Sequence, residues 1–200
     1  MPIGRLGAMG ARAEGTVSFT RMADGTAEDY ALLDRYEELY LEGLPDRLLA
    51  ALDKLKGSFG GYQVTRYEHS LQVATRALRD GKDEGYVVAT LLHDIGDELA
   101  PWTHGEMVAA VLKPYVDPAV CWMIGHHGAF QLYYYGHHTG QDRNVRDRWR
   151  DHPNYAMTAE FCERYDQASF DPAYDELPIE EFEPMVRLVF AEPRFLTEIS

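Results

Sequence analysis

The sequence has few cysteines, few basic residues and no long hydrophobic run. Its two cysteines, Cys121 and Cys162, lie far apart in apolar surroundings, so we expect reduced core residues and no disulfide framework. Lys and Arg number 19 against 33 Asp and Glu, and the net charge of -14 argues against nucleic acid or an anionic membrane as the main partner. No apolar run approaches the roughly 18 residues of a membrane span, and the N-terminus lacks an apolar signal region. We therefore expect a cytoplasmic protein.

Alternating strand patterns are also nearly absent, whereas helical periodicity covers most of the chain. Hydrophobic residues make up 46% of the sequence, which is enough for a sizeable core. We predict an all-α fold, with a flexible Gly/Ala/Arg-rich arm over residues 1–17 and a single helical domain over residues 18–200. The first helix begins near Thr26, and apolar side chains recur along it at helical spacing, which favours a core-facing surface. These side chains are Tyr30, Leu33, Tyr36, Leu39 and Tyr40.

The stretch from Val87 to Glu98, VVATLLHDIGDE, organises the rest of the chain. Its apolar run predicts a buried helix that carries adjacent His93 and Asp94 to its end, with Gly96 placed like a C-cap. A neutral imidazole beside a carboxylate makes a good ligand pair for a divalent metal. A metal would also remove the cost of burying the charged Asp94. The alternative is that the pair only caps a core helix.

Further metal-type side chains occur at helix positions elsewhere. His69 lies within a helix predicted over residues 64–79, and His104 follows a predicted N-cap at Thr103. His126 and His127 lie between glycines at the predicted end of an apolar helix. Asp166 ends a predicted helix that begins at Pro153.

Three other stretches allow two interpretations each. The glycine-rich loop over residues 57–62 is either a lid over the site or a plain connector. The segment QLYYYGHHTG, residues 131–140, either lines a pocket mouth or packs as an aromatic elbow. The arginines of residues 143–152 favour a solvated, self-paired helix over an anion site.

The ordered set of motifs from Tyr62 to Asp166 resembles the HD-domain superfamily. The motifs are YEHSLQ, LLHDIGDE, WTH, GHH and ERYD. The resemblance implies an HD-type helical bundle with two metals in its core, and Asp94 as the central catalytic residue that bridges them. It implies that the first metal is held by His69, His93, Asp94 and Asp166, and the second by His104 with His127 or His126. Such a histidine-rich set suits iron, with Mn²⁺ or Mg²⁺ as alternatives.

Within the superfamily the sequence is most similar to the small mixed-valence di-iron oxygenases, of which myo-inositol oxygenase and the aminohydroxyethylphosphonate oxygenase are known types. The similarity lies in EHSLQ, in the 24-residue step from His69 to His93, and in a tryptophan before His104. It implies an Fe²⁺/Fe³⁺ pair that uses O₂ to oxidise and cleave a C–P or C–C bond. The implied substrate is a small hydroxylated compound, phosphonate-like or an amino or polyol compound.

The residues expected around the substrate depart from those of the phosphonate enzymes. The lysine four residues after the last histidine ligand becomes Gln131, counted from His127, or Phe130, counted from His126, and a third histidine becomes Asp97. The lid tyrosine and glutamate align with Phe59 and Tyr62. An aminohydroxyethylphosphonate substrate is therefore not expected. One hypothesis is that Asp97 and Glu98 favour a cationic substrate group such as an amine. The other is that Arg143 and Arg146 fold back over the metals and supply a replacement anion site. The candidate substrate-binding residues are Tyr62, Asp97, Gln131 and Arg143.

Two other functions compete with the oxygenase. One is a metal-dependent HD phosphohydrolase acting on a nucleotide or phosphoester, in which the metals activate water. The other is a metal-stabilised binding module without turnover. The sequence makes no prediction of oligomeric state.

Overall fold

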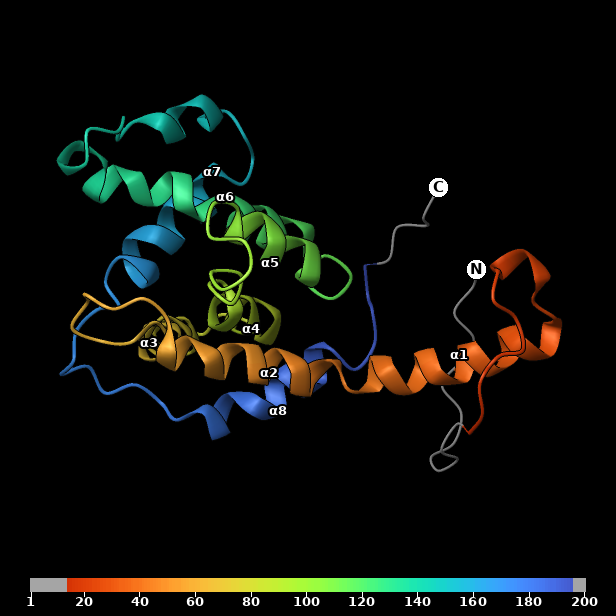
Figure 1. The fold of residues 1–200 in the computed structure, drawn as a ribbon. Helices are drawn as coiled ribbons and strands as arrows, with labels where there is room; N and C mark the ends of the chain where they lie inside the picture. The colour runs from red at the N-terminus through yellow and green to blue at the C-terminus, as the bar shows by residue number, and fades with distance from the viewer. Residues whose placement is uncertain (1–13, 196–200) are drawn as a thin grey trace. The chain divides into compact units, whose positions relative to one another are not determined.

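The computed structural model describes residues 14–195, and within this range it contains helices and loops but no strand (Figure 1). The all-α prediction is thus confirmed. The chain divides into two compact units, residues 1–44 and 45–200, each of which is described by itself. The predicted arm, residues 1–17, lies mostly outside the described residues.

The first unit contains a 3₁₀ turn, η1 (Met22–Asp24), and the helix α1 (Ala27–Glu42). Helix α1 begins next to Thr26, as predicted. Thr26 caps it, because its side chain accepts from the Asp29 amide while the Asp29 carboxylate accepts from the Thr26 amide. Asp29 is the one buried residue of α1. The prediction that this helix turns an apolar surface towards the core is wrong, since Leu33, Tyr36 and Leu39 are 37–43% exposed.

The second unit carries the remaining helices. They are α2 (Leu44–Lys54), α3 (Arg66–Arg79), α4 (Glu84–Leu92), α5 (His104–Leu112), α6 (Pro118–Tyr135), α7 (Tyr155–Glu160) and α8 (Ile179–Val189). Short 3₁₀ turns join them, namely η2 (Leu55–Gly57), η3 (Gly136–His138) and η4 (Val145–Trp149). A π-helical segment, η5 (Phe161–Asp166), continues α7.

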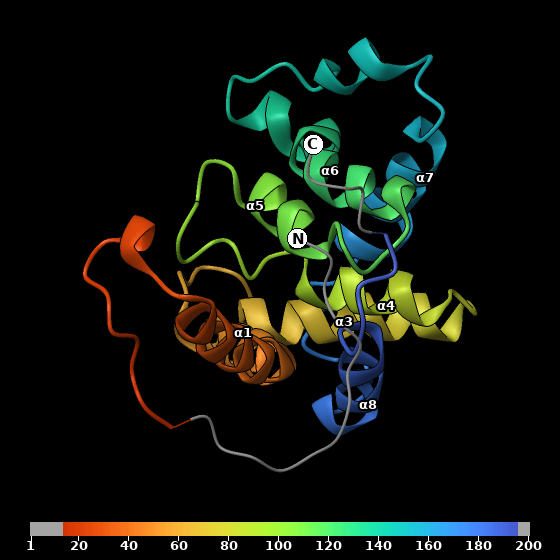
Figure 2. The same cartoon turned by 90° about the vertical axis from the view of Figure 1, so that its right-hand side faces the viewer.

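Helix α4 forms the centre of this unit. It packs against α3, α6 and α8, and both views place α6 on one side of it and α8 on the other (Figures 1 and 2). Every residue from Tyr86 to Leu92 is buried, and all of them except Thr90 are hydrophobic, so this stretch is covered on all faces. Burying a leucine side chain fully, as at Leu91 and Leu92, contributes about 1.5–3 kcal/mol to the free energy of folding. This packing fixes the C-terminal end of α4, where His93 and Asp94 follow.

Helix α6 is longer than the sequence pattern predicted. We expected it to end at the glycines around His126 and His127, but it continues to Tyr135. A Cβ at Gly125 would lie 3.4 Å from the Ala109 Cβ, and one at Gly128 would meet no atom within 4 Å. Gly125 therefore lies where α6 meets α5, and neither glycine breaks the helix. The two histidines sit in the middle of α6 rather than at its end.

Within the described residues, no helix has both the length and the apolar character that crossing a lipid bilayer requires.

Candidate metal centre

Six side chains from five elements meet next to the end of α4. His93 is the C-cap of α4 and Asp94 follows it, while His69 comes from the first half of α3. The other three are His104 at the start of α5, His127 in α6, and Asp166 at the end of η5. All are buried except His104, whose side chain is 22% exposed.

The four imidazoles form two close pairs. The Nε2 atoms of His69 and His93 are 3.3 Å apart, and those of His104 and His127 are 3.1 Å apart. Two imidazole nitrogens bound to one metal at about 2.1 Å, with ordinary coordination angles, lie about 3.0–3.4 Å from each other. Both pairs therefore have the spacing of ligands that share an ion.

Asp94 lies between the two pairs and presents one oxygen to each. Its Oδ2 is 3.0 Å from His93 Nε2 and 3.5 Å from His69 Nε2. Its Oδ1 is 3.5 Å from His104 Nε2 and 3.6 Å from His127 Nε2. Asp166 Oδ1 is 3.3 Å from His69 Nε2, so this second carboxylate joins only the first pair. This is the arrangement of a carboxylate that bridges two metals.

The far nitrogen of each buried imidazole is held by a backbone carbonyl. The Nδ1 atoms of His69, His93 and His127 lie 2.6–2.8 Å from the carbonyl oxygens of Ser169, Thr90 and Ile124. A carbonyl can only accept, so each Nδ1 carries the proton and each Nε2 offers its lone pair. Lone pairs that face one another at these distances repel unless a cation lies between them.

The carboxylates also fit a cation. Asp94 Oδ1 and Asp166 Oδ2 are buried, and neither has a hydrogen-bond partner among the described residues. Burial raises the pKa of Asp94, but Arg66 and His93 outweigh it and hold that pKa well below its usual range. A buried carboxylate oxygen without a partner is costly, and metal coordination removes that cost. The residues present thus fit a group of one or two metal ions, and three overlapping sets of them meet the spacing of a site.

The π-helical turn of η5 sets the position of Asp166. The amide of Gln167 donates to the carbonyl of Cys162, five residues earlier, at 3.0 Å. This wider turn places Asp166 against His69 and lets the chain leave so that the Ser169 carbonyl reaches the same histidine. π-Helical turns are rare and frequent at functional sites.

Two glycines allow α5 to approach the centre closely. A Cβ at Gly96 would lie 2.7 Å from the His104 carbonyl oxygen, and one at Gly105 would lie 2.7 Å from the Ile124 carbonyl oxygen and 3.1 Å from His127 Nδ1. We expected Gly96 to cap α4, but the C-cap of this helix is His93. The glycine instead makes room for the backbone of His104. Thr103 precedes α5 as predicted, but its side chain makes no capping bond.

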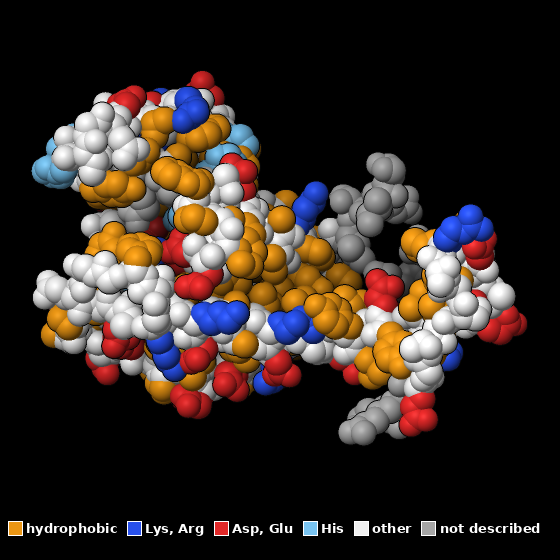
Figure 3. Space-filling model, viewed as in Figure 1, with side chains coloured by type: hydrophobic (Ala, Val, Ile, Leu, Met, Phe, Trp, Pro, Cys, Tyr) orange, Lys and Arg blue, Asp and Glu red, His pale blue; other side chains and the backbone are white. Residues whose placement is uncertain are grey.

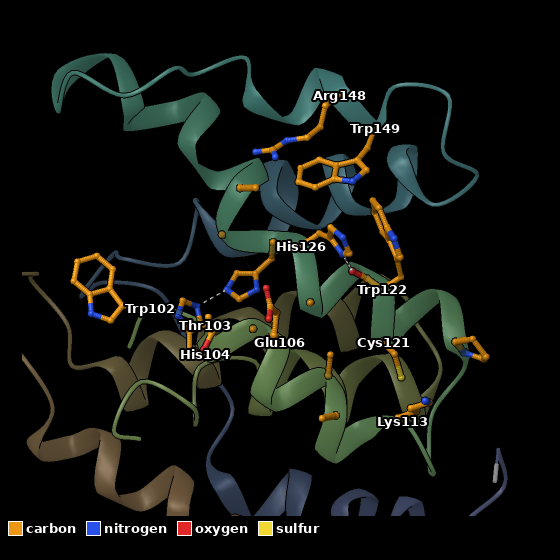
Figure 4. Close-up of a pocket in the computed structure, with 18 of the residues that line it drawn as sticks. Trp102, Thr103, His104, Glu106, Lys113, Cys121, Trp122, His126, Arg148 and Trp149 are labelled. Atoms are coloured by element: carbon orange, nitrogen blue, oxygen red, sulfur yellow. Dashed lines mark hydrogen bonds between the residues drawn. The ribbon is translucent and has the colours of Figure 1, made fainter. Parts of the chain in front are cut away.

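His126 lies apart from the other histidines. Its ring stacks on Trp122 at 4.0 Å between centroids and meets Trp149 edge-on at 4.9 Å. Its Nδ1 contacts the Trp122 carbonyl. In Figure 4 His126 points towards Trp122 and Trp149, while His104 lies on the other side of α6. The structure therefore brings His127, and not His126, to the metal centre.

The cavity shown in Figure 4 measures about 990 Å³ and lies between α5 and α6. It shares only His104, His127 and Gly128 with the smaller cavity that opens onto both carboxylates of the centre. Because the larger cavity reaches neither Asp94 nor Asp166, we place the chemistry in the smaller one.

The smaller cavity has a volume of about 480 Å³, which suits a small molecule. Three of the four candidate substrate-binding residues line it, namely Tyr62, Asp97 and Gln131. Arg143 does not; its guanidinium lies 4.5 Å from the Tyr133 ring, and that of Arg146 lies 3.6 Å from the same ring. The surface in Figure 3 is hollowed between the part built by α5–α7 and the part built by α2–α4, with acidic side chains at the edge of the hollow.

Arg66 is the residue of the centre that the sequence analysis missed. Its guanidinium donates from Nη2 to Asp94 Oδ2, and to Asp97 Oδ2 at 3.2 Å from Nη2 and 3.3 Å from Nε. Asp97 also lies 3.3 Å from His104 Nδ1, so it orients a metal-type histidine. The available signal was the i, i+3 spacing of Arg66 and His69, which places both on one face of α3.

A second missed residue is Phe170. Its ring stacks on His69 at 4.3 Å and on Tyr62 at 4.7 Å between centroids. The loop over residues 57–62 is thereby linked to a metal-type histidine through two aromatic rings. Whether the loop moves as a lid stays a prediction.

Comparison with known families gives a match over half of the chain. The family model described as HD domain matches residues 66–165, which include Arg66 and all the clustered residues except Asp166. A search of curated proteins gave no significant match. Members of the matched family are generally metal-dependent enzymes, which agrees with a buried cluster of histidines and carboxylates that fits metal ions. With half of its length matched and an all-helical fold around this cluster, the chain belongs to the HD-domain family.

Proposed function

We propose that this protein is a di-iron oxygenase that uses O₂ to oxidise and cleave a C–P or C–C bond of a small hydroxylated substrate. The observation that carries the proposal is Asp94, which offers one oxygen to each of two imidazole pairs. Four imidazoles and two carboxylates favour iron over magnesium, which prefers oxygen ligands. The irons, when bound, would supply the redox chemistry with O₂.

The residues of the chain have separate roles in this proposal. His69, His93 and Asp166 would hold one ion, His104 and His127 the other, and Asp94 both. The backbone carbonyls behind the imidazoles keep the Nε2 lone pairs directed inwards. The rings of Phe59, Tyr62 and Phe170 line the cavity and would contact the apolar part of a bound substrate.

A phosphohydrolase is the second candidate, and Arg66 favours it. The lysine of the phosphonate enzymes is absent here, but Arg66 lines the cavity and could contact a phosphoryl oxygen. In that case the metals would activate water for attack on a phosphoester.

Metal analysis followed by electron paramagnetic resonance separates these functions. We expect about two irons per chain and, after partial reduction, a coupled mixed-valence signal. Oxygen uptake should then accompany the conversion of a hydroxylated phosphonate, amine or polyol. A protein that holds manganese or magnesium, gives no such signal and hydrolyses phosphoesters without O₂ would contradict the oxygenase.

A further inference from the structure

The larger cavity, which we call the α5–α6 cavity, borders the metal centre but has no role in the functions considered so far. Its volume is about 990 Å³, against about 480 Å³ for the cavity at the metals. Both cavities are lined by His104, His127 and Gly128. The boundary between them is therefore formed by two histidines of the metal centre and one glycine.

Gly128 stands out because its surroundings do not require a glycine. It lies inside α6, where glycine lowers helix stability relative to alanine. A Cβ at this position would meet no atom within 4 Å, so no close packing explains the missing side chain. A longer side chain would instead extend into the space that borders both cavities. The glycine thus leaves the boundary between the two cavities open.

The α5–α6 cavity is lined by all three tryptophans of the sequence, Trp102, Trp122 and Trp149. The ring of Trp122 lies between those of His126 and His152, at 4.0 and 4.1 Å between centroids. It meets Trp149 edge-on at 6.2 Å. Trp102, by contrast, is 96% exposed and lies beside His104 (Figure 4). An indole ring exposed at the edge of a cavity offers apolar surface for a ligand to cover.

The rest of the lining favours an apolar or aromatic ligand over a charged one. The charged residues of the lining are Glu106, Lys113 and Arg148, and all three are exposed, so their ends stay in water. Small residues line the cavity along α5 and α6, namely Gly105, Ala109, Ala110, Gly125, Gly128 and Ala129. Small side chains beside indole rings make a groove that a flat or extended apolar group fits.

We propose that the α5–α6 cavity is a second substrate subsite, which binds an elongated apolar or aromatic tail while the reacting end of the same molecule lies at the metals. Gly128 is the residue that lets the substrate pass from one cavity to the other. This inference rests on the proposed function, because it takes the metals as the place of reaction. It narrows the small hydroxylated substrate to one that carries such a tail.

A series of ω-phenylalkylphosphonates with one to six methylene groups tests this subsite, with methylphosphonate as the compound that has no tail. Each compound is titrated by calorimetry into the manganese-loaded full chain, whose metal content is measured first. The Kd should fall at least about tenfold once the phenyl ring reaches past Gly128, because the ring then leaves water. Tryptophan fluorescence should change at the same chain length, since every tryptophan of the protein lines that cavity.

The variant G128L tests the passage between the cavities. The quantity compared is the Kd of methylphosphonate divided by that of the tightest phenylalkyl compound. This ratio should fall from at least about ten to about one in G128L, because the leucine side chain blocks the passage. The control A156L adds the same side chain at an exposed position of α7 that lines neither cavity, and it should keep the ratio. W102A, which changes a loop residue, should reduce the ratio without altering α6.

The outcomes separate the two proposals. If the unaltered chain does not take up two metals, the dinuclear function fails and the subsite falls with it. If it takes up two metals but its affinity does not depend on chain length, or if G128L and W102A keep the ratio of A156L, only the subsite is overturned. If affinity rises with chain length while tryptophan fluorescence stays constant, the tail lies against Phe59 or Tyr62 in the smaller cavity, which also overturns the subsite.

Discussion

Asp94 and Asp166 are both buried carboxylates beside histidines, but they face different numbers of metal positions. Asp94 contacts both imidazole pairs, one through each oxygen, whereas Asp166 contacts only the pair formed by His69 and His93. The two residues therefore differ in what their loss should remove.

We expect D94A to lose both metals and D166N to retain the one held by His104 and His127. Metal counts per chain by mass spectrometry check this, with D34A, at an exposed carboxylate of α1, as the control that keeps both. D94A should also lose the stabilisation that metals provide, about 4 kcal/mol at a metal concentration a thousand times Kd. Unchanged metal content and melting temperature in D94A would refute the bridging role.

At the level of single residues, the sequence predicts which types of side chain form the metal site, but not which of two adjacent histidines belongs to it. His126 and His127 are adjacent in the chain and differ by about 100° around α6. Only the packing of α6 against α5 and η4 decides which of them turns inwards. Arg66 was missed because arginines on a helix are common and usually solvated, and nothing local to the sequence shows that Asp97 returns to meet it.

At the scale of helices, α5 and α6 cross at small residues. Gly105 lies against the Ile124 carbonyl and His127, while Gly128, three residues further along α6 than Gly125, faces open space. Gly105 and Gly128 are therefore both helical glycines, but a Cβ would be crowded at Gly105 and free at Gly128.

We expect G105A and G128A to change stability in opposite directions. In G105A the new methyl group has no room, so the free energy of unfolding should fall by about 1–3 kcal/mol and metal affinity should fall with it, since His127 must shift. In G128A the methyl group is unopposed in a helix interior, so stability should rise by up to about 1 kcal/mol. Chemical denaturation followed by circular dichroism measures both. Equal destabilisation by the two changes would contradict this account of the crossing.

Helix starts could be predicted better than helix ends. Thr26 and Pro45 signal the starts of α1 and α2 through side-chain capping and the fixed backbone of proline. The glycines near His127 look like a stop signal, but tertiary contacts carry α6 past them to Tyr135. The π-helical turn of η5 has no signal in residue type, because it depends on what Asp166 and Ser169 contact.

For the molecule as a whole, metals should link stability to pH. Burial lowers the pKa of His93, but Asp94 raises it more, and the net shift in the metal-free protein is upwards. Because the pKa of His93 is higher in the folded than in the unfolded chain, its protonation stabilises the metal-free fold. This stabilisation is complete below the ordinary histidine pKa of about 6.5 and is lost as the pH rises through the raised pKa. Metal affinity instead increases with pH, because the histidine side chains that coordinate a metal must be neutral.

The difference in melting temperature with and without metal should therefore increase from about pH 5.5 to about pH 8. Scanning calorimetry in the presence of manganese or of a chelator measures it, and D94A should show no difference at any pH. A difference that is constant or that falls with pH would count against imidazole ligands.

The helical class and the HD family could be predicted from periodicity and from ordered motifs, because both signals depend on the spacing of residues that are close in the sequence. The metal and the substrate could not be fixed in this way. They depend on which groups converge from distant segments, and Arg66, Asp97 and Phe170 come together only in the folded chain.

The π-helical turn at η5 makes the metal site sensitive to chain length. One residue fewer between Tyr155 and Tyr165 would let this stretch relax into a regular α-helix and rotate Asp166 by about 100° about the helix axis, away from His69. Such a deletion would give a better-formed helix and a worse metal site. Among natural length variants of this chain, the count of residues in this one turn should therefore separate those that hold both metals from those that have kept only the fold.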